Sequence, residues 1–512
     1  MGFTTLKTGP KKLGGADTVH INGPTTTFGE VATADLFPIA QGDFVHGLNE
    51  QVFNTSSFAG STVDTQNGMV ELSSGTETSG SATVQLRRNL KYRAGQGSLM
   101  RGTALFDTPD AGNAQFIGAG SAECGYFIGY FGNNFGILHS ETGAREVRKL
   151  EISSAVTTNA DVTVTLDGES IVIPVTGSNS TTQTAYQLSL GDYTQLGRGG
   201  WLTDVVSSSV YFITARSTPL ATGSYSVSGG GIAGAFSRTV EGQAQTNTFI
   251  PSSSFNIDPL DGTGPSGLDL DPQKGNVYQI GFQYLGFGNA KFQVEDPETG
   301  NLIKFHELKN ANTRTTPVLK DPNVSILATS ANIGGTTSKT LKSASMAAFV
   351  EGASFKLDPK YATSVAFSSL NSATYKPLLA LKANRLIGEQ SSFGEFDLLK
   401  IAASNESSSS TPRTLTVALF LNPKINGDVE FEYVKENDSL VSRAILDPST
   451  NTFDNVANLV PFYELTVGAG GGVTEMLQVL DFVFGPGSCV VVGIKTTGGL
   501  AGAVSLNWYE QQ

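Results

Sequence analysis

The chain is poor in the residues that build metal centres, disulfide frameworks and charged interfaces. Only two cysteines, Cys124 and Cys489, and four histidines occur among 512 residues. These numbers predict neither a disulfide framework nor a zinc site. Each cysteine lies in an apolar, strand-like stretch, so we expect two buried free thiols. Charged residues make up 15% of the chain, against ~25% in typical soluble domains.

Long hydrophobic runs are also missing. No window approaches the ~18 apolar residues of a membrane span, and the first residues, MGFTTLKTGPKKLGG, have no apolar core after their lysines. We therefore expect no membrane span and no secretory signal. The net charge of −13 is spread along the chain, which leaves no basic surface for nucleic acid.

The chain is rich in glycine and phenylalanine, and many of its segments alternate apolar with polar residues. It contains 59 glycines and 30 phenylalanines, and apolar and polar residues alternate with period two in many short segments. Its length suggests three or four domains at about 150 residues each. The sequence thus predicts an all-β fold with little helix, made of several domains.

The segment 276–306 gives the clearest strand pattern. Tyr278, Ile280 and Phe282 fall on one face of a first strand, and Phe292 and Val294 on one face of a second. A DPETG turn then leads into a third strand, because proline presets φ and glycine accepts positive φ. We expect an antiparallel meander here.

A separate unit is expected between about 150 and 245. Asp167-Gly168 is a two-residue hairpin signal between alternating strands, and a short helix is expected over 181–190. The predicted division is an N-terminal arm or attachment segment (1–70), a jelly roll (71–150 plus 246–375), an inserted small β or α+β domain (151–245) and a C-terminal β-sandwich (376–512). Trp508, in a terminal strand, would anchor either its own sandwich or an adjacent chain.

Several segments carry a family resemblance: RRNLKYRAGQGSLMRGTALFD, GNVYQIGFQYLGFGNAKFQVEDPETG and SASMAAFVEG. They resemble the concanavalin-A-like or laminin-G-like jelly roll of structural proteins from double-stranded DNA viruses, as TYKPLLALK, RTLTVALFLNP and NWYEQQ resemble the sandwich ends of such proteins. The resemblance spans roughly residues 75 to 512. It implies a virion component such as a tail fibre, baseplate or head-decoration subunit.

Two groups of residues are candidate binding sites. A glycine-rich loop carries closely spaced carboxylates that either hold Ca²⁺ or form solvated turns, namely Asp258, Asp261, Asp269 and Asp271. A second group either stacks on sugar rings of host glycans or fills the sandwich core, namely Phe131, Asn133, Asn134, Phe135 and Trp201. No cofactor other than calcium is expected.

No catalytic residues are predicted. The segment GEFDLLK around Glu395 and Asp397 resembles the E-x-D-x-x-E pattern of jelly-roll glycosidases, but Lys400 stands where the second catalytic glutamate belongs. We therefore expect no enzyme activity. The leading hypothesis is a virion structural protein that assembles with itself and with other virion proteins. The alternatives are a host-glycan-binding adhesion module and, third, a polysaccharide-degrading enzyme.

Overall fold

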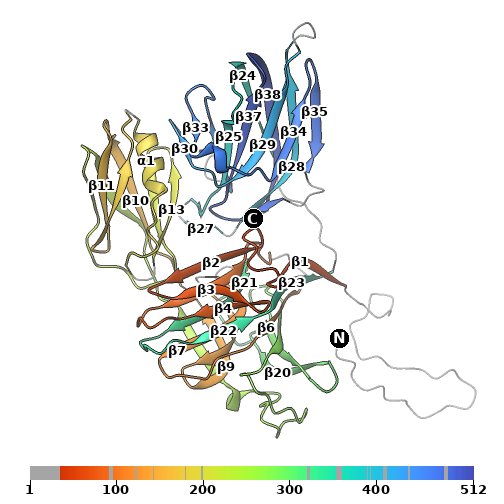
Figure 1. Ribbon diagram of the computed structural model, residues 1–512. Helices are drawn as coiled ribbons and strands as arrows, with labels where there is room; N and C mark the ends of the chain where they lie inside the picture. Colours follow the sequence, from red (N-terminus) through yellow and green to blue (C-terminus); the bar gives the residue numbers. More distant parts are fainter. Residues whose placement is uncertain are drawn as a thin grey trace, which may run out of the picture.

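The computed structural model is built almost entirely of antiparallel strands (Figure 1). It describes residues 35–91, 96–121, 124–141, 143–178, 180–197, 200–319, 323–352, 360–388, 390–392, 394–407, 412–435, 439–477 and 482–511. Within these ranges, no helix is long and apolar enough to cross a membrane. The predicted fold class, a multi-domain all-β protein with a jelly roll, a small insert and a C-terminal sandwich, is confirmed.

The jelly roll occupies the lower part of Figure 1. Its larger sheet has seven strands, in spatial order β17 (Thr246–Pro251), β9 (Asn134–Glu141), β8 (Gly125–Phe131), β7 (Asn113–Gly120), β21 (Ser325–Asn332), β5 (Ser81–Leu86) and β2 (Phe53–Phe58). Its second sheet has six, β1 (Leu36–Asp43), β23 (Ser345–Glu351), β6 (Ser98–Ala104), β18 (Asn276–Phe282), β19 (Ala290–Glu295) and β20 (Leu302–Leu308). A small sheet adds β22 (Thr340–Ser343), β4 (Met69–Ser73) and β3 (Thr62–Gln66).

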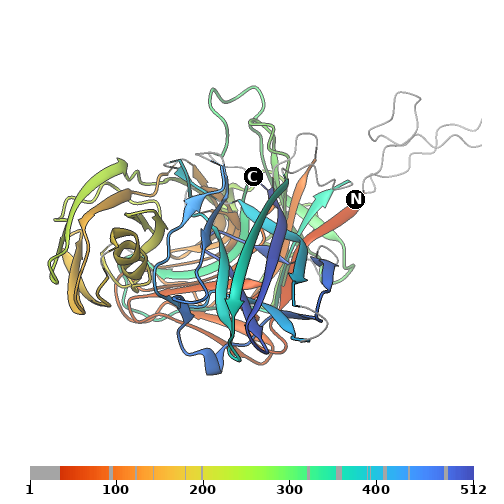
Figure 2. The same cartoon turned by 90° about the horizontal axis from the view of Figure 1, so that it is seen from above.

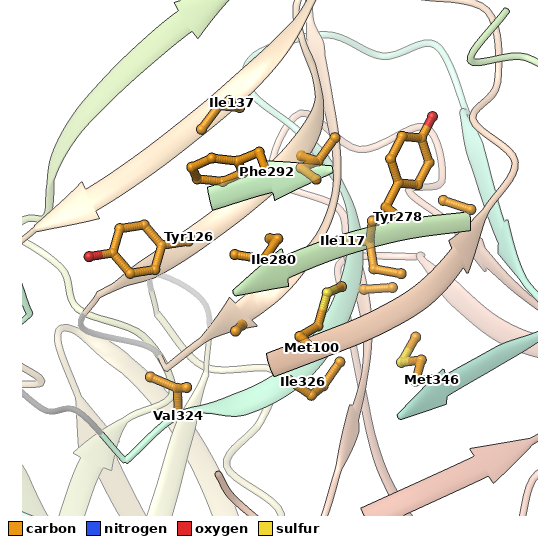
Figure 3. Close-up of a cluster of buried hydrophobic side chains, with 14 of the residues drawn as sticks. Met100, Ile117, Tyr126, Ile137, Tyr278, Ile280, Phe292, Val324, Ile326 and Met346 are labelled. Carbon is orange, nitrogen blue, oxygen red and sulfur yellow. The ribbon is translucent and has the colours of Figure 1, made fainter. Parts of the chain in front are cut away.

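A single aromatic-rich core fills the space between these sheets. Figure 3 shows Tyr278, Ile280 and Phe292 of the six-stranded sheet close to Ile117 and Tyr126 of the seven-stranded sheet, all of them buried. The alternation in 276–306 places these side chains on one face, as strand geometry requires. The predicted meander is confirmed, because β18 pairs with β19 and β19 with β20, both antiparallel.

The predicted N-terminal arm is wrong from residue 36 onward. The strand β1 pairs with β23 at the edge of the six-stranded sheet, with Leu36 opposite Glu351, and β2, β3 and β4 also belong to the jelly roll. Residues 36–43 show little alternation because β1 is a partly exposed edge strand. A proline is tolerated there, and Pro38 lies next to a shift of register.

The inserted unit lies at the upper left of Figure 1. It contains a four-stranded sheet of β13 (Trp201–Val206), β14 (Ser209–Thr214), β10 (Val147–Ser154) and β16 (Ala233–Val240), a three-stranded sheet of β12 (Glu169–Val175), β11 (Ala160–Leu166) and β15 (Ser226–Ser228), and the helix α1 (Thr181–Ser189). Figure 2 shows α1 beside these strands, and its Gln183 and Tyr186 accept hydrogen bonds from the C-terminal sandwich. The predicted helix and hairpin are confirmed: Ser180 caps α1 and Leu166 pairs with Glu169.

The chain leaves and re-enters the jelly roll at neighbouring strands. Thr246, the first residue of β17, pairs with Glu141, the last of β9. The insert therefore occupies a single interruption at one edge of the seven-stranded sheet.

The C-terminal sandwich lies at the upper right of Figure 1. One sheet contains β24 (Lys360–Leu370), β38 (Leu500–Gln511), β28 (Glu395–Asn405) and β35 (Gly472–Met476), with β36 (Val483–Phe484) also on β28. The other contains β31 (Glu432–Tyr433), β32 (Val441–Ile445), β25 (Lys376–Ala383), β37 (Cys489–Thr496), β29 (Leu415–Leu421) and β34 (Tyr463–Val467). Short pairs join β26 (Leu386–Ile387) to β27 (Gln390–Ser391), and β30 (Ile425–Asn426) to β33 (Thr452–Phe453).

Two results on this sandwich bear on the sequence predictions. The boundary at residue 375 is wrong, because β24 pairs with β38 and so belongs to the C-terminal sandwich. Trp508 is fully buried in the core of its own sandwich, which decides between the two packing alternatives for this side chain.

The insert and the sandwich also share one cluster of buried side chains, which includes Val205 and Phe420.

Candidate functional site

The predicted calcium residues lie in the loop between β17 and β18, where their carboxylates serve as turn acceptors. Asp258 accepts hydrogen bonds from the backbone N–H groups of Leu260 at 2.9 Å and Ser266 at 2.8 Å, and Asp261 accepts from Thr263. Among the described residues, no three metal-binding side chains gather in one place. A calcium ion therefore stays a prediction from the sequence alone.

The predicted glycan-binding residues do not form one site. Phe131, Asn133 and Asn134 lie at the turn between β8 and β9, where Phe131 is 42% exposed, with its ring centroid 5.7 Å from that of Phe249. Phe135 packs against the jelly-roll core. Trp201 is buried in the insert, so the structure separates it from the other four.

Glu395 and Asp397 are both buried on β28, and Glu395 contacts the jelly roll. The backbone N–H of Asn89 donates to Glu395 Oε1, and Lys91 Nζ lies 3.9 Å from Oε2. Burial raises the pKa of Glu395, against the opposing effects of Lys91, Asn89 and Arg88. The carboxylate thus connects two domains.

We expect Glu395→Gln to remove the pH dependence that this carboxyl gives to the stability, because an amide does not titrate while its oxygen can still accept from Asn89. A raised folded-state pKa means that the folded state holds a proton that the unfolded state releases. The parent's stability should therefore fall as pH rises above about 4.5, the ordinary value for glutamate. Urea unfolding of both proteins from pH 4.5 to 8 measures the difference.

The exposed Glu430→Gln provides the control and should follow the parent at every pH. A Glu395→Gln protein that loses stability in parallel with the parent over this range would contradict the assignment.

A polar pocket opens at the edge of the jelly roll, between β9, β17 and the segment 308–316 that follows β20. Its volume is about 530 Å³, within the usual range of small-molecule sites. His139 and Glu141 enter it from β9, since alternate residues share a face and Ile137 on that face belongs to the core. Thr248 enters from β17, opposite His139.

The ring of His139 is held firmly at the base of this pocket. It is 4% exposed and stacks on Tyr126 with the ring centroids 4.8 Å apart. Nδ1 lies 3.0 Å from Glu141 Oε1, and Nε2 lies 3.4 Å from the carbonyl oxygen of Val318. Burial lowers the pKa of His139, with Glu141 acting in the opposite direction.

Glu141 also forms a two-point ion pair with Arg314. Nη1 of Arg314 donates to Oε1 at 2.9 Å and Nη2 donates to Oε2, an arrangement that fixes both groups in one plane. Nε of Arg314 is buried and has no hydrogen-bond partner among the described residues. Lys309, also lining the pocket, has no ion-pair partner there. The pocket therefore combines one carboxylate, which an ion pair neutralises, with two cationic donors, Arg314 Nε and Lys309 Nζ, that have no partner among the described residues.

The segment that carries Lys309 and Arg314 is fixed by its own hydrogen bonds. Asn310 Nδ2 donates to the carbonyl of Gly288 at 2.7 Å, and its backbone N–H donates to Asn289. Thr313 Oγ1 donates to the carbonyl of Asn310 at 2.7 Å. The pocket wall is thus preformed and presents hydroxyl, amide and charged groups.

The sequence interpretation missed this pocket. In the sequence analysis the histidines are considered only as zinc ligands, although His139 and Glu141 are two residues apart and share a face of any strand that contains both. Arg314 gave no comparable signal, because its contact with Glu141 depends on how the chain returns from β20 past the edge of the other sheet.

No protein-family model matches the sequence, and no curated protein matches it. Among solved structures, a glycosyl hydrolase family protein from Mycobacterium fortuitum covers 61% of this chain and 99% of its own, with 9% identity and a TM-score of 0.29. The GH16 protein of the Bacteroides ovatus mixed linkage glucan PUL covers 60% and 98%, with 8% identity and a TM-score of 0.26. A Bauhinia forficata lectin in complex with GalNAc covers 62% and 98%, with 10% identity and a TM-score of 0.23.

These matches correct one sequence prediction and leave another without support. The prediction that the chain is not an enzyme is contradicted by the glycosyl hydrolases among them. None of these matches links the chain to a virus. Similarity this low assigns no activity, so the function has to be argued from the pocket itself.

Proposed function

We propose that the jelly roll binds a carbohydrate in the pocket that His139, Glu141 and Arg314 line. The observation that carries the proposal is the mixture of polar groups around one preformed cavity. A sugar hydroxyl both donates and accepts hydrogen bonds, and this wall offers an accepting carboxylate, donating guanidinium and ammonium groups, and several threonine hydroxyls. A purely apolar ligand would leave Arg314 Nε and Lys309 Nζ unpaired, at a cost of about 1–3 kcal/mol for each one that it buries.

The exposed residue Lys309 at the pocket allows carbohydrate binding to be tested by substitution. We expect Lys309→Ala to weaken binding of a glycan ligand about tenfold, because it removes one charge-assisted hydrogen bond. A glycan array with the full chain identifies the ligand, and titration calorimetry measures the affinity of each variant. Lys309 is exposed, so the fold should be unaffected.

Lys274→Ala is the matched control, since Lys274 is a 79% exposed lysine of the same domain outside the pocket. An array without any ligand, or a ligand whose affinity is unchanged by both Lys309→Ala and Arg314→Ala, would refute the proposal.

The same glycans should be assayed for new reducing ends. Among its described lining residues the pocket holds one carboxylate, Glu141, whereas retaining and inverting hydrolysis commonly use two. This favours binding as the role of this pocket. Cleavage that disappears in Glu141→Gln would replace binding by hydrolysis at this site.

Self-assembly of the chain is predicted from its low charge content, which leaves few charged residues to block strand edges, and assembly on a virion is predicted from the sequence resemblance. Both stay predictions. Light scattering across a range of concentrations tests self-assembly, and a strict monomer at every concentration would contradict it.

A further inference from the structure

A second cavity, of about 310 Å³, lies between the insert and the C-terminal sandwich. Helix α1 and strand β13 line one side, and β25 and the segments around 422–424 and 487–489 line the other. The two sides are joined by the shared buried cluster and by hydrogen bonds such as Val429 N–H to Gln183 Oε1 at 3.0 Å. The cavity is therefore part of a fixed interface.

Its charge is unusual for an acidic chain. Three cationic residues line it, Lys382, Arg385 and Lys424, against one acidic residue, Asp204, among the described lining residues. The Cys489 thiol adds no negative charge at neutral pH, because burial raises its pKa to about 12.

Both oxygens of the single carboxylate already accept hydrogen bonds. Asp204 Oδ1 accepts from Lys382 Nζ at 2.5 Å, and Oδ2 accepts from the backbone N–H of Arg385 at 2.7 Å. Asp204 and Lys382 thus neutralise each other. The charges of Arg385 and Lys424 remain without a matching carboxylate in the cavity.

The guanidinium of Arg385 is confined but not paired. It lies against Gly487, where a Cβ atom would come within 2.2 Å of Nη2, and no described residue accepts a hydrogen bond from it. Burial lowers the pKa of Arg385, and the positive charges of Arg145 and Arg87 lower it further, against the effect of Asp204. The Arg385 guanidinium therefore lies near other positive charges at a position where an anionic ligand would supply a counter-charge.

We propose that this cavity binds a compact oxyanion, a phosphate or sulfate group, held by the Arg385 guanidinium and the Lys424 ammonium. A guanidinium matches two oxygens of such a group at once. Both groups belong to the C-terminal sandwich, but the insert forms the opposite wall of the cavity, so binding would stabilise the folded chain in which the two units are in contact.

Titration calorimetry of the full chain with inorganic phosphate, and separately with sulfate, tests the proposal at constant ionic strength. We expect one site per chain for at least one of these anions and a rise in the thermal unfolding midpoint on saturation. Lys424→Ala should weaken binding about tenfold through loss of one charged contact, and Arg385→Gln should abolish it. Lys424 is exposed, so its replacement should leave the fold intact even where Arg385→Gln does not.

Lys274→Ala serves again as the control and should bind like the parent. The proposal is overturned if neither anion binds, if chloride at equal ionic strength gives the same rise in unfolding midpoint, or if Lys424→Ala binds with the parent's affinity. The site is independent of the jelly-roll pocket, so Lys309→Ala should leave anion binding unchanged.

Discussion

Replacing Trp508 with alanine is expected to destabilise the C-terminal sandwich by about 3–5 kcal/mol, the usual loss for a large buried aromatic side chain. Trp508 is fully buried on β38 and stacks on Tyr361 with ring centroids 6.0 Å apart. Its Nε1 donates to Glu510 Oε1 at 3.1 Å, and Glu510 in turn accepts from Ser439 and from the backbone N–H of Leu440. The substitution therefore leaves a cavity and a weakened buried network.

Urea unfolding, combined with hydrogen exchange to assign the transition to the C-terminal sandwich, measures this loss, because a multi-domain chain need not unfold in one step. Val460→Ala is the control: Val460 is 85% exposed, and its loss should change stability by no more than about 0.5 kcal/mol. A Trp508→Ala protein within 1 kcal/mol of the parent, by the same scale of core substitutions, would show that the packing described here is wrong.

The separate variant Asp204→Ala is expected to lower the free energy of unfolding by about 3–5 kcal/mol, because it leaves the buried Lys382 ammonium without its partner. The side chain of Lys382 is 11% exposed. Its Nζ also donates to the carbonyl of Val205 at 2.6 Å and lies 4.7 Å from the centre of the Phe431 ring. Those contacts cannot replace a carboxylate.

The double variant Asp204→Ala with Lys382→Met separates charge from packing. Removing both charges should restore much of the stability lost in the single variant, since a buried ion pair often adds little over apolar side chains of similar volume. A urea-unfolding cycle of the four proteins measures the coupling. Equal losses in the single and double variants would mean that the pair is not the source of the effect.

Local patterns predicted the strands better than the boundaries between domains. The meander, the hairpin at Asp167 and the helix after Ser180 each depend on a few neighbouring residues, and all three occur in the structure. The edge strand β1 and the transfer of β24 to the C-terminal sandwich depend on pairing with β23 and β38, far along the chain. Alternation does not reveal the partner of a strand.

The candidate sites were also hard to predict, because local sequence does not show which distant residues come together. Turn-forming aspartates such as Asp258 and Asp261 have the same spacing whether they bind a cation or cap a loop. The sequence suggested aromatic residues, whereas the charged groups of the two cavities are brought together from distant segments, such as Glu141 with Arg314 and Asp204 with Lys382.

The position of β38 bears on how the protein is made. This strand lies between β24 and β28, with Lys360 opposite Tyr509 and Glu395 opposite Gln511. While the ribosome is still synthesising the residues before 500, both flanking strands lack their central partner, and the surface on which Trp508 later packs is uncovered. The jelly roll and the insert, whose strands all precede residue 352, can fold during translation. The C-terminal sandwich can complete its fold only after β38 has been synthesised, and until then the unpaired edges of β24 and β28 are open to aggregation.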